Sequence, residues 1–233
     1  MKKLLAIFTI SLVWIMFGSI SYAINMQPIS TFSDWIGELS IGDNQSTYDP
    51  TYITPNGNSV DINITGNSAD YIWTGLYLYQ EDSPLNRVGM LATISISSIN
   101  GNAQAGIVDS IGKVGNDRIQ VYMYLQQWDN GQKGIRFRIR TRDLTTGTQK
   151  QLAAGVIGEW DGGWNLGDNI TVGFMRTEND FWFYAEGYPG FVKWTHTGGT
   201  VEDFQWSPEV YGYTDPGTGN SVTANVSNVY IIN

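Results

Sequence analysis

The sequence predicts an all-β protein, a two-sheet antiparallel β-sandwich built from many short strands. Three observations predict this class. Several segments alternate apolar and polar residues or are rich in β-branched and aromatic residues, as half-buried strands are. Clusters of Gly, Asn and Asp separate these segments, which is the composition of tight turns. Apolar residues almost nowhere recur at the ~3.6-residue spacing of an amphipathic helix.

The predicted strands follow one another along the whole chain. They comprise residues 71–79, 91–99, 118–128, 135–143, 169–174, 180–188 and 221–232. The clearest turns between them are residues 129–134, 177–181 and 215–221. Because there is no Pro/Ser-rich linker, charge block or internal repeat, we expect a single β-sandwich domain over residues 24–233.

Residues 1–23 have the pattern of an export signal that is removed from the mature protein. Two lysines precede an apolar run that ends at Phe17, and Ser21 and Ala23 are small residues at the positions that a signal peptidase reads. The run is shorter than the ~18 residues that a membrane-spanning helix needs, so no stable membrane insertion is expected. These features predict a secreted or periplasmic protein.

Composition narrows the classes of partner. The chain has no cysteine, which excludes disulfides and a thiolate nucleophile. Its formal charge is −9, and −11 once the two lysines of the signal are removed, so nucleic acid and anionic membrane surfaces are not expected as partners. No organic cofactor is expected. A structural calcium ion is left open, because Asp43, Asp49 and Asp215 stand in loops rich in oxygen ligands.

One predicted strand carries a row of arginines. Residues 135–142 have an arginine at every second position, from Arg136 to Arg142, with apolar residues and one threonine between them. The preceding strand alternates in the same way, and its polar side consists of Gln120, Tyr122, Tyr124, Gln126 and Trp128. Since side chains two positions apart share a face, the apolar sets should face the core. A hairpin would then place Tyr124 near Arg138 or Arg140 on the outer face.

Two other segments also direct aromatic residues away from the core. In residues 71–79 the outward set includes Tyr77. In a hairpin over residues 170–186 the outward set is Trp182, Tyr184 and Glu186, with Gly173 opposite Tyr184 and open space above that glycine. We expect one sheet surface to carry these residues together with the arginines.

Three segments carry a resemblance to a known family. They are "WNLGDNITVGFMRTENDFWFYAEG" (164–187), "AQAGIV" (103–108) and "VTANVSNVYII" (222–232). The first resembles the tryptophan, Gly-Asp turn and strand hairpin of concanavalin A-like lectin/glucanase domains, and the others are similar to their central and closing strands. The resemblance implies a jelly roll in which the concave face of one sheet holds a saccharide.

The residues of the predicted outer face suit a saccharide. Aromatic rings stack on the apolar faces of sugars, and arginine holds carboxylate or sulfate with two parallel hydrogen bonds. We therefore predict an exported, lectin-like domain that binds a polysaccharide, in particular an anionic one, with Trp128 and Trp182 as the main stacking residues. The predicted ligand-binding residues are Tyr77, Tyr122, Tyr124, Gln126, Trp128, Arg136, Arg138, Arg140, Trp182, Tyr184 and Glu186.

Several alternatives stay open from the sequence. The arginines and tyrosines could form a purely structural ladder, with Glu186 or Asp109 as counter-charges, in an adhesive surface protein. The chain could also be a small outer-membrane β-barrel with the arginines in its lumen.

An enzyme acting on polysaccharides is a further alternative. A glycoside hydrolase needs two carboxylates, for which Glu159 and Asp161 are weak candidates, and His196 is the only histidine. Polysaccharide lyases of this fold use an arginine or glutamine and a tyrosine, residue types that are present here. However, the Gln-(Ile/Val)-His triplet of the alginate lyases is missing. The catalytic residues are therefore unknown from sequence.

Overall fold

The computed structural model describes residues 25–66, 69–78, 87–158 and 163–233. The predicted export signal and the two acidic residues Glu159 and Asp161 lie outside these ranges. The strands, in chain order, are β1 (Met26–Pro28), β2 (Ile36–Ile41), β3 (Asn44–Ser46), β4 (Ile53–Asn56), β5 (Ser59–Thr65), β6 (Ile72–Tyr77), β7 (Gly89–Asn100), β8 (Ala103–Val114), β9 (Asp117–Gln127), β10 (Lys133–Asp143), β11 (Gln149–Ile157), β12 (Asn169–Thr177), β13 (Asp180–Ala185), β14 (Val192–Thr195), β15 (Glu202–Gln205), β16 (Glu209–Thr214) and β17 (Ser221–Ile232).

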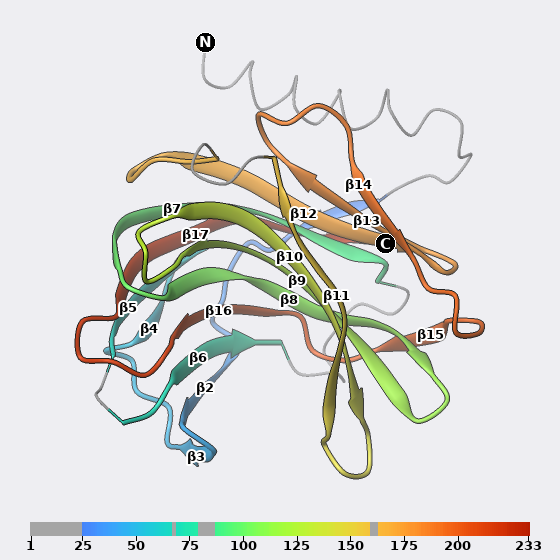
Figure 1. Ribbon diagram of the computed structural model, residues 1–233, viewed down its shortest axis with the longest axis horizontal. Coiled ribbons are helices and arrows are strands. Elements are labelled where there is room, and N and C mark those ends of the chain that lie inside the picture. Colours follow the sequence, from blue (N-terminus) through green and yellow to red (C-terminus); the bar gives the residue numbers. More distant parts are fainter. Residues whose placement is uncertain (1–24, 67–68, 79–86, 159–162) are drawn as a thin grey trace.

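These strands form two sheets. Sheet A has the order β14-β13-β12-β7-β17-β5-β4, with β1 beside β17. Sheet B has the order β11-β10-β9-β8-β16-β6-β2-β3, with β15 beside β8. All neighbouring strands run antiparallel and the sheets pack as two layers (Figure 1). The prediction of a two-sheet antiparallel β-sandwich is confirmed. In the part of the chain that is described, no helix is long and apolar enough to cross a membrane.

The core lies between the sheets and is made by the apolar sets that alternation predicts. Ile119 and Val121 of β9 and Ile135 and Ile139 of β10 are completely buried in it. Across the core, Phe137 of β10 stacks on Phe183 of β13, with ring centroids 4.3 Å apart. One aromatic pair therefore joins the two hairpins of the sequence prediction, one from each sheet. Such a pair adds ~0.5–1.5 kcal/mol beyond the area that it buries.

The predicted faces of both hairpins and the register of β12–β13 are confirmed, whereas in β9–β10 Tyr124 lies directly opposite Arg136 and not opposite Arg138 or Arg140. In β9–β10, Arg136 lies opposite Tyr124 and Arg138 opposite Tyr122, and the pairing is regular along the whole of β10. In β12–β13, Gly173 lies opposite Tyr184. The faces are therefore those expected from the sequence, because no bulge interrupts either hairpin.

The expectation that all the outward aromatic residues share one surface is wrong. The β12–β13 hairpin belongs to sheet A, whereas β9, β10 and β6 belong to sheet B. Trp182, Tyr184 and Glu186 therefore lie on the opposite layer from the arginines. Alternation shows which side chains leave the core but not which sheet carries them, because both layers obey the same period.

The space expected above Gly173 is also occupied. A Cβ atom at this position would lie 2.7 Å from Cδ1 of Leu91 and 2.8 Å from the carbonyl oxygen of Met90. Glycine is therefore needed here for close packing of β12 against β7 rather than for an open site.

Candidate functional site

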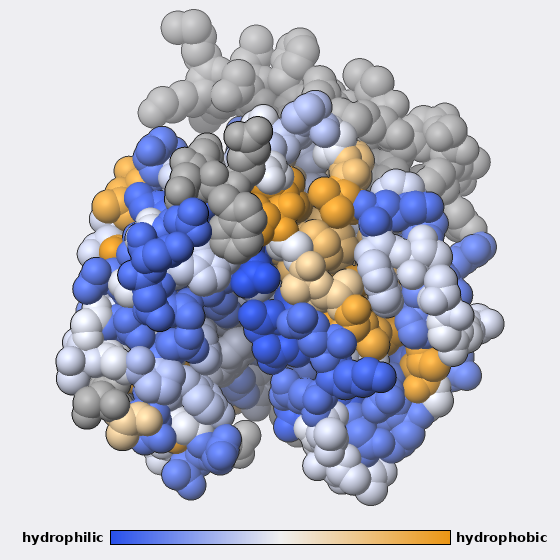
Figure 2. All heavy atoms as spheres, in the orientation of Figure 1, coloured by the Kyte–Doolittle hydropathy of each residue, from blue (hydrophilic) through white to orange (hydrophobic). Residues whose placement is uncertain are grey.

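The outer face of sheet B carries a large groove. It has a volume of about 1270 Å³ and is lined by side chains of β2, β6, β8, β9, β10 and β16 together with the turn that follows β10. Figure 2 shows the molecule hollowed at the lower centre of the view, with hydrophilic residues on both sides. Of the predicted ligand-binding residues, those that line the groove are Tyr77, Tyr122, Gln126, Trp128, Arg136, Arg138 and Arg140.

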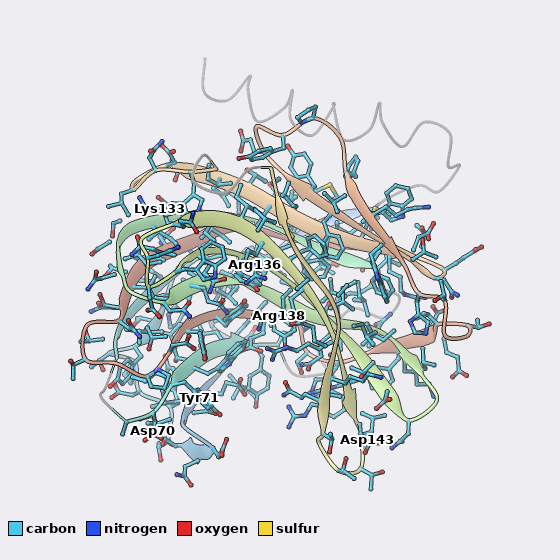
Figure 3. The ribbon with its side chains drawn as sticks, in the orientation of Figure 1. Asp70, Tyr71, Lys133, Arg136, Arg138 and Asp143 are labelled. Carbon is cyan, nitrogen blue, oxygen red and sulfur yellow. The ribbon has the colours of Figure 1, made fainter. Side chains whose placement is uncertain are left out.

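One wall of the groove is the arginine row, which we define as Arg136, Arg138, Arg140 and Arg142 of β10. Figure 3 shows Arg136 and Arg138 near the middle of this face, with Tyr71 on one side and Asp143 on the other. Each of the first three guanidinium groups lies over a tyrosine ring of β9. The distances from the guanidinium carbon to the ring centroid are 6.0 Å for Arg136–Tyr124, 5.5 Å for Arg138–Tyr124 and 5.6 Å for Arg140–Tyr122.

The arginine row has no carboxylate partner among the residues that the structure describes. Arg136 donates to Oε1 of Gln126 at 3.1 Å and Arg140 to Oε1 of Gln149 at 3.0 Å, both neutral acceptors. All the ion pairs found lie elsewhere, including the buried one in which Arg87 holds Asp109. Asp109 is therefore not the counter-charge of the row, as the structural-ladder alternative had suggested, and Glu186 lies on sheet A.

Several guanidinium nitrogens in this wall are buried without a hydrogen-bond partner. They are the Nε atoms of Arg136, Arg138 and Arg118, the last of which comes from β9. A buried unsatisfied donor is costly, by about 1–3 kcal/mol, and is more so when it carries charge. Among the described residues, the side chains around this wall therefore supply fewer acceptors than its guanidinium groups can use.

The tyrosines below the row are too buried to stack on a ligand. Tyr122 is 5% exposed and Tyr124 is completely buried, so their predicted role as stacking platforms is corrected. Burial raises the pKa of Tyr122 to about 12, because the interior disfavours the phenolate. The hydroxyl of Tyr124 has no hydrogen-bond partner in the described structure. These rings hold the arginines in place, and any sugar would contact the guanidinium groups first.

The opposite wall carries two carboxyl groups. Nε1 of Trp73 lies 3.0 Å from Oε1 of Glu38 and 2.9 Å from Oε1 of Glu209, so that one indole donor serves both. Burial, and then the adjacent Glu38, raise the pKa of Glu209 well above its usual value. Gly75 provides the room, because a Cβ atom there would lie 2.0 Å from Oε1 of Glu209. We call Glu38 and Glu209 the carboxyl pair.

Trp73 connects the two walls through an aromatic cluster. Its ring stacks on Tyr211 at 4.2 Å with an angle of 8° between the planes, and meets Tyr122 edge-on at 6.3 Å. Tyr211 is fully buried. This packing fixes the floor of the groove.

Trp128 and Trp206 line the groove and are at least partly exposed to solvent. Trp128 is partly exposed at the end of β9, where the guanidinium carbon of Arg136 lies 5.3 Å from its ring centroid. Trp206 is 41% exposed, and Arg118 lies 4.7 Å from its ring centroid. Trp128 therefore lines the groove just after β9, and Trp206 is another groove tryptophan that the sequence did not single out.

The three candidates on sheet A make local contacts of their own. Nε1 of Trp182 donates to Oγ1 of Thr177 at 3.0 Å, and Oε2 of Glu186 accepts from the backbone N–H of Thr171 at 3.2 Å. Tyr184 packs against Phe191 with ring centroids 5.8 Å apart. None of the three lines the groove.

The remaining candidates do not assemble into a catalytic or metal site. His196 lies beside Trp194, with ring centroids 5.7 Å apart, and does not line the groove. Asp43 and Asp215 line the groove, whereas the carboxylate of Asp49 caps its own turn through Thr51. Within the described residues, no three acidic or histidine side chains come close enough together to hold a metal ion.

Several groove residues were missed by the sequence analysis. Glu38, Glu209 and Tyr213 line the groove, and the buried Tyr211 lies beneath it; they belong to β2 and β16, strands that were not predicted from the sequence. The segment "EVYGYT" (209–214) alternates clearly enough to have indicated a strand with these tyrosines on one face. No local signal connects Glu38 with Glu209, because the fold brings them together from opposite ends of the chain.

Comparison with known proteins identifies the fold. Neither the family models nor the curated protein sequences give a match. Among solved structures, the catalytic domain of an endo-1,3-β-glucanase (laminarinase) from Thermotoga petrophila aligns with a TM-score of 0.56 and 10% identity over 90% of this chain and 98% of that chain. A glycoside hydrolase family 16 endo-glucanase from Bacteroides ovatus aligns with a TM-score of 0.54 and 12% identity over 88% and 99%. The alginate lyase Aly36B aligns with a TM-score of 0.51 and 11% identity over 88% and 96%. The chain therefore has the concanavalin A-like jelly-roll fold that the sequence resemblance predicted.

Proposed function

We propose that the groove of sheet B binds an acidic polysaccharide. The observation that carries the proposal is the arginine row: cations gathered in one groove of a protein with a formal charge of −9, without a carboxylate partner among the described residues. A carboxylate or sulfate group would supply the counter-charge that the partly exposed guanidinium groups of the row lack among the described residues. The structural fold relatives include enzymes that act on glucans and on alginate, which supports a carbohydrate ligand.

The geometry favours arginine as the contact residue. Cation–π contacts with buried tyrosines hold the guanidinium groups before any ligand arrives, so that less side-chain entropy is lost on binding. Arg142 lies six residues after Arg136 along β10, so the row is ~20 Å long at the ~3.4 Å rise per residue of a strand. The groove volume of about 1270 Å³ exceeds the ~300–1,000 Å³ of ordinary small-molecule pockets. Both dimensions suit a chain of sugars.

The export pattern of residues 1–23 supports a location outside the cytoplasm. We propose that the mature protein meets its polysaccharide in the periplasm or the medium. Trp128 and Trp206, which line the groove, would stack on sugar rings while the arginine row holds the anionic groups.

A polysaccharide lyase is the second candidate. One of the fold relatives described above is an alginate lyase, and the groove brings arginines, a glutamine and tyrosines together, which are the residue types that such a reaction needs. A lyase takes the proton beside the uronate carboxyl group, breaks the bond to the next sugar oxygen and leaves an unsaturated uronate. The raised pKa of Tyr122 opposes its use as the base.

A glycoside hydrolase fits the geometry less well. Retaining enzymes need carboxyl groups ~5–5.5 Å apart and inverting enzymes need a larger gap. Here Glu38 and Glu209 share one indole donor, Nε1 of Trp73, on one wall of the groove. Both carboxyl groups therefore lie on the same side of a bound sugar chain, whereas the two carboxyl groups of a glycosidase flank the bond that is broken.

The test uses purified residues 24–233 with neutral, uronate-containing and sulfated polysaccharides. Retention of the protein and ultraviolet absorbance from unsaturated uronate are recorded on the same samples. We expect retention by anionic polymers, and Arg138→Ala to weaken it at least tenfold, or ~1.4 kcal/mol, with little change in melting temperature. Rising absorbance would identify a lyase.

The matched control is Lys193→Ala. Lys193 also lies over an aromatic ring, that of Trp182 at 5.3 Å, but on sheet A. This variant should bind like the wild type. Absence of retention on every polymer, with a lowered melting temperature in Arg138→Ala, would favour the structural ladder and refute the proposed function.

A further inference from the structure

The groove is electrically divided across the strands of sheet B. The arginines that line it all come from β9 and β10. Of the acidic residues that line it, only Asp143 belongs to that side. The others, Glu38, Asp43, Glu209 and Asp215, lie on β2 and β16 or in the loops that directly follow them. In sheet order, β8 stands between the two sets.

The distance between the two sets of charges follows from the strand order of sheet B. From β10 to β16 there are three strand spacings, or ~14 Å at ~4.8 Å each. A chain of sugars crossing the strands from the arginine row would therefore reach the carboxyl pair within a few residues. An anionic group at that point would be repelled, whereas a hydroxyl or amide group would find acceptors.

The carboxyl pair is held in place and is not a loose surface cluster. Both groups bind Nε1 of Trp73, whose ring is fixed by its stack on Tyr211. Glu209 also fills the space left by Gly75. The pair therefore presents its oxygens to the groove at a fixed position.

We propose that the groove selects acidic polysaccharides in which charged sugars alternate with uncharged ones, over polymers with a carboxylate on every sugar. This inference rests on the proposed function and assigns the carboxyl pair as its specificity determinant. The arginine row binds the charged sugar, and the carboxyl pair receives the hydroxyl or amide groups of an uncharged sugar. A second charged sugar is disfavoured there.

The experiment compares two polymers at equal ionic strength. Polygalacturonate has a carboxylate on every sugar, and hyaluronan on every second sugar. The wild type is expected to bind hyaluronan at least fivefold more tightly per binding site. The variant is Glu38→Gln/Glu209→Gln, because a single change would leave the other carboxyl free to ionise. It should bind polygalacturonate about fivefold more tightly than the wild type does, so that the preference for hyaluronan is lost.

The matched control removes two exposed carboxylates outside the groove, Asp61→Asn/Glu202→Gln. If the control shifts the preference as much as the groove variant, net charge alone is responsible and the inference fails. It fails equally if the groove variant leaves the wild-type preference unchanged. The proposed function fails separately if the wild type binds neither polymer, or if Arg138→Ala leaves binding of both unaltered.

Discussion

The β9–β10 and β12–β13 hairpins follow the same sequence pattern, but their outward side chains differ in burial and in contacts. Each alternates core and outward residues, and each places a glycine of a neighbouring strand opposite an outward tyrosine, Gly106 opposite Tyr124 and Gly173 opposite Tyr184. Tyr124 is completely buried under arginines, whereas Tyr184 stays partly exposed. A side chain that points away from the core is therefore not always exposed to solvent, because the side chains of neighbouring strands can cover it.

The cations of the two hairpins differ in the same way. Lys193 lies over Trp182 and also pairs with Asp180 at 3.2 Å, a complete surface arrangement that needs no further partner. Arg138 lies over Tyr124 with no carboxylate among the described residues and with its Nε buried and unpartnered. A cation–π contact alone therefore does not mark a binding site. What distinguishes the arginine row from Lys193 is the absence of a counter-charge among the described residues, and this is the observation on which the proposed function rests.

The largest expected effect is on stability. Tyr124→Ala should lower the free energy of unfolding by ~3–5 kcal/mol, because it empties a buried ring site and removes the support of two arginines. Tyr184→Ala should lower it by less than ~1.5 kcal/mol, since its ring is partly solvated. Urea denaturation of both variants measures the difference. If both variants lost the same free energy of unfolding, the two tyrosines would contribute equally to stability and the contrast between the hairpins would be wrong.

Much of the fold could be predicted because it depends on local pattern. The period of two identified the core residues of β9, β10, β12 and β13, and short turns between them determined the register. The assignment of Trp182 to the surface of the arginines failed because sheet membership depends on long-range pairing. No alternation within a hairpin contains that information.

In the candidate site, too, contacts within one hairpin could be predicted and contacts between distant strands could not. The arginine row and its tyrosines come from adjacent strands of one hairpin and were identified. The carboxyl pair joins Glu38 and Glu209 across strands that enclose β6, and no short segment indicates that meeting. The burial of Tyr122 could not be predicted either, because it depends on Trp73 and Tyr211 packing against it from other strands.

A smaller effect sharpens the contrast between the two cations. Arg138→Lys keeps the charge but loses the planar fork that donates two parallel hydrogen bonds and stacks on the ring. We expect binding of an acidic polysaccharide to weaken about five- to tenfold, or ~1–1.4 kcal/mol, by isothermal titration. Lys193→Arg on sheet A should change it less than twofold. An Arg138→Lys variant that binds like the wild type would mean that only the charge of the row matters.

The smallest expected effect concerns pH and the carboxyl pair. Burial and the neighbouring Glu38 raise the pKa of Glu209 in the folded protein above the 4.5 of a free glutamate. The folded state therefore holds this proton more tightly than the unfolded chain, and the resulting stabilisation is complete below about pH 4.5 and is lost as pH rises through the raised pKa.

Glu209→Gln cannot ionise and does not lose stability in this way. At pH 4 the two proteins should have similar free energies of unfolding, and by pH 8 the variant should be more stable by ~1 kcal/mol, a shift of ~2–4 °C in melting temperature. Thermal denaturation at several pH values measures the difference, in which other titrating groups common to both proteins largely cancel. The variant Glu186→Gln, on sheet A, should follow the wild type at every pH. A constant difference between wild type and Glu209→Gln would mean that the carboxyl pair holds no extra proton, and that the two walls of the groove differ less in charge than their residues suggest.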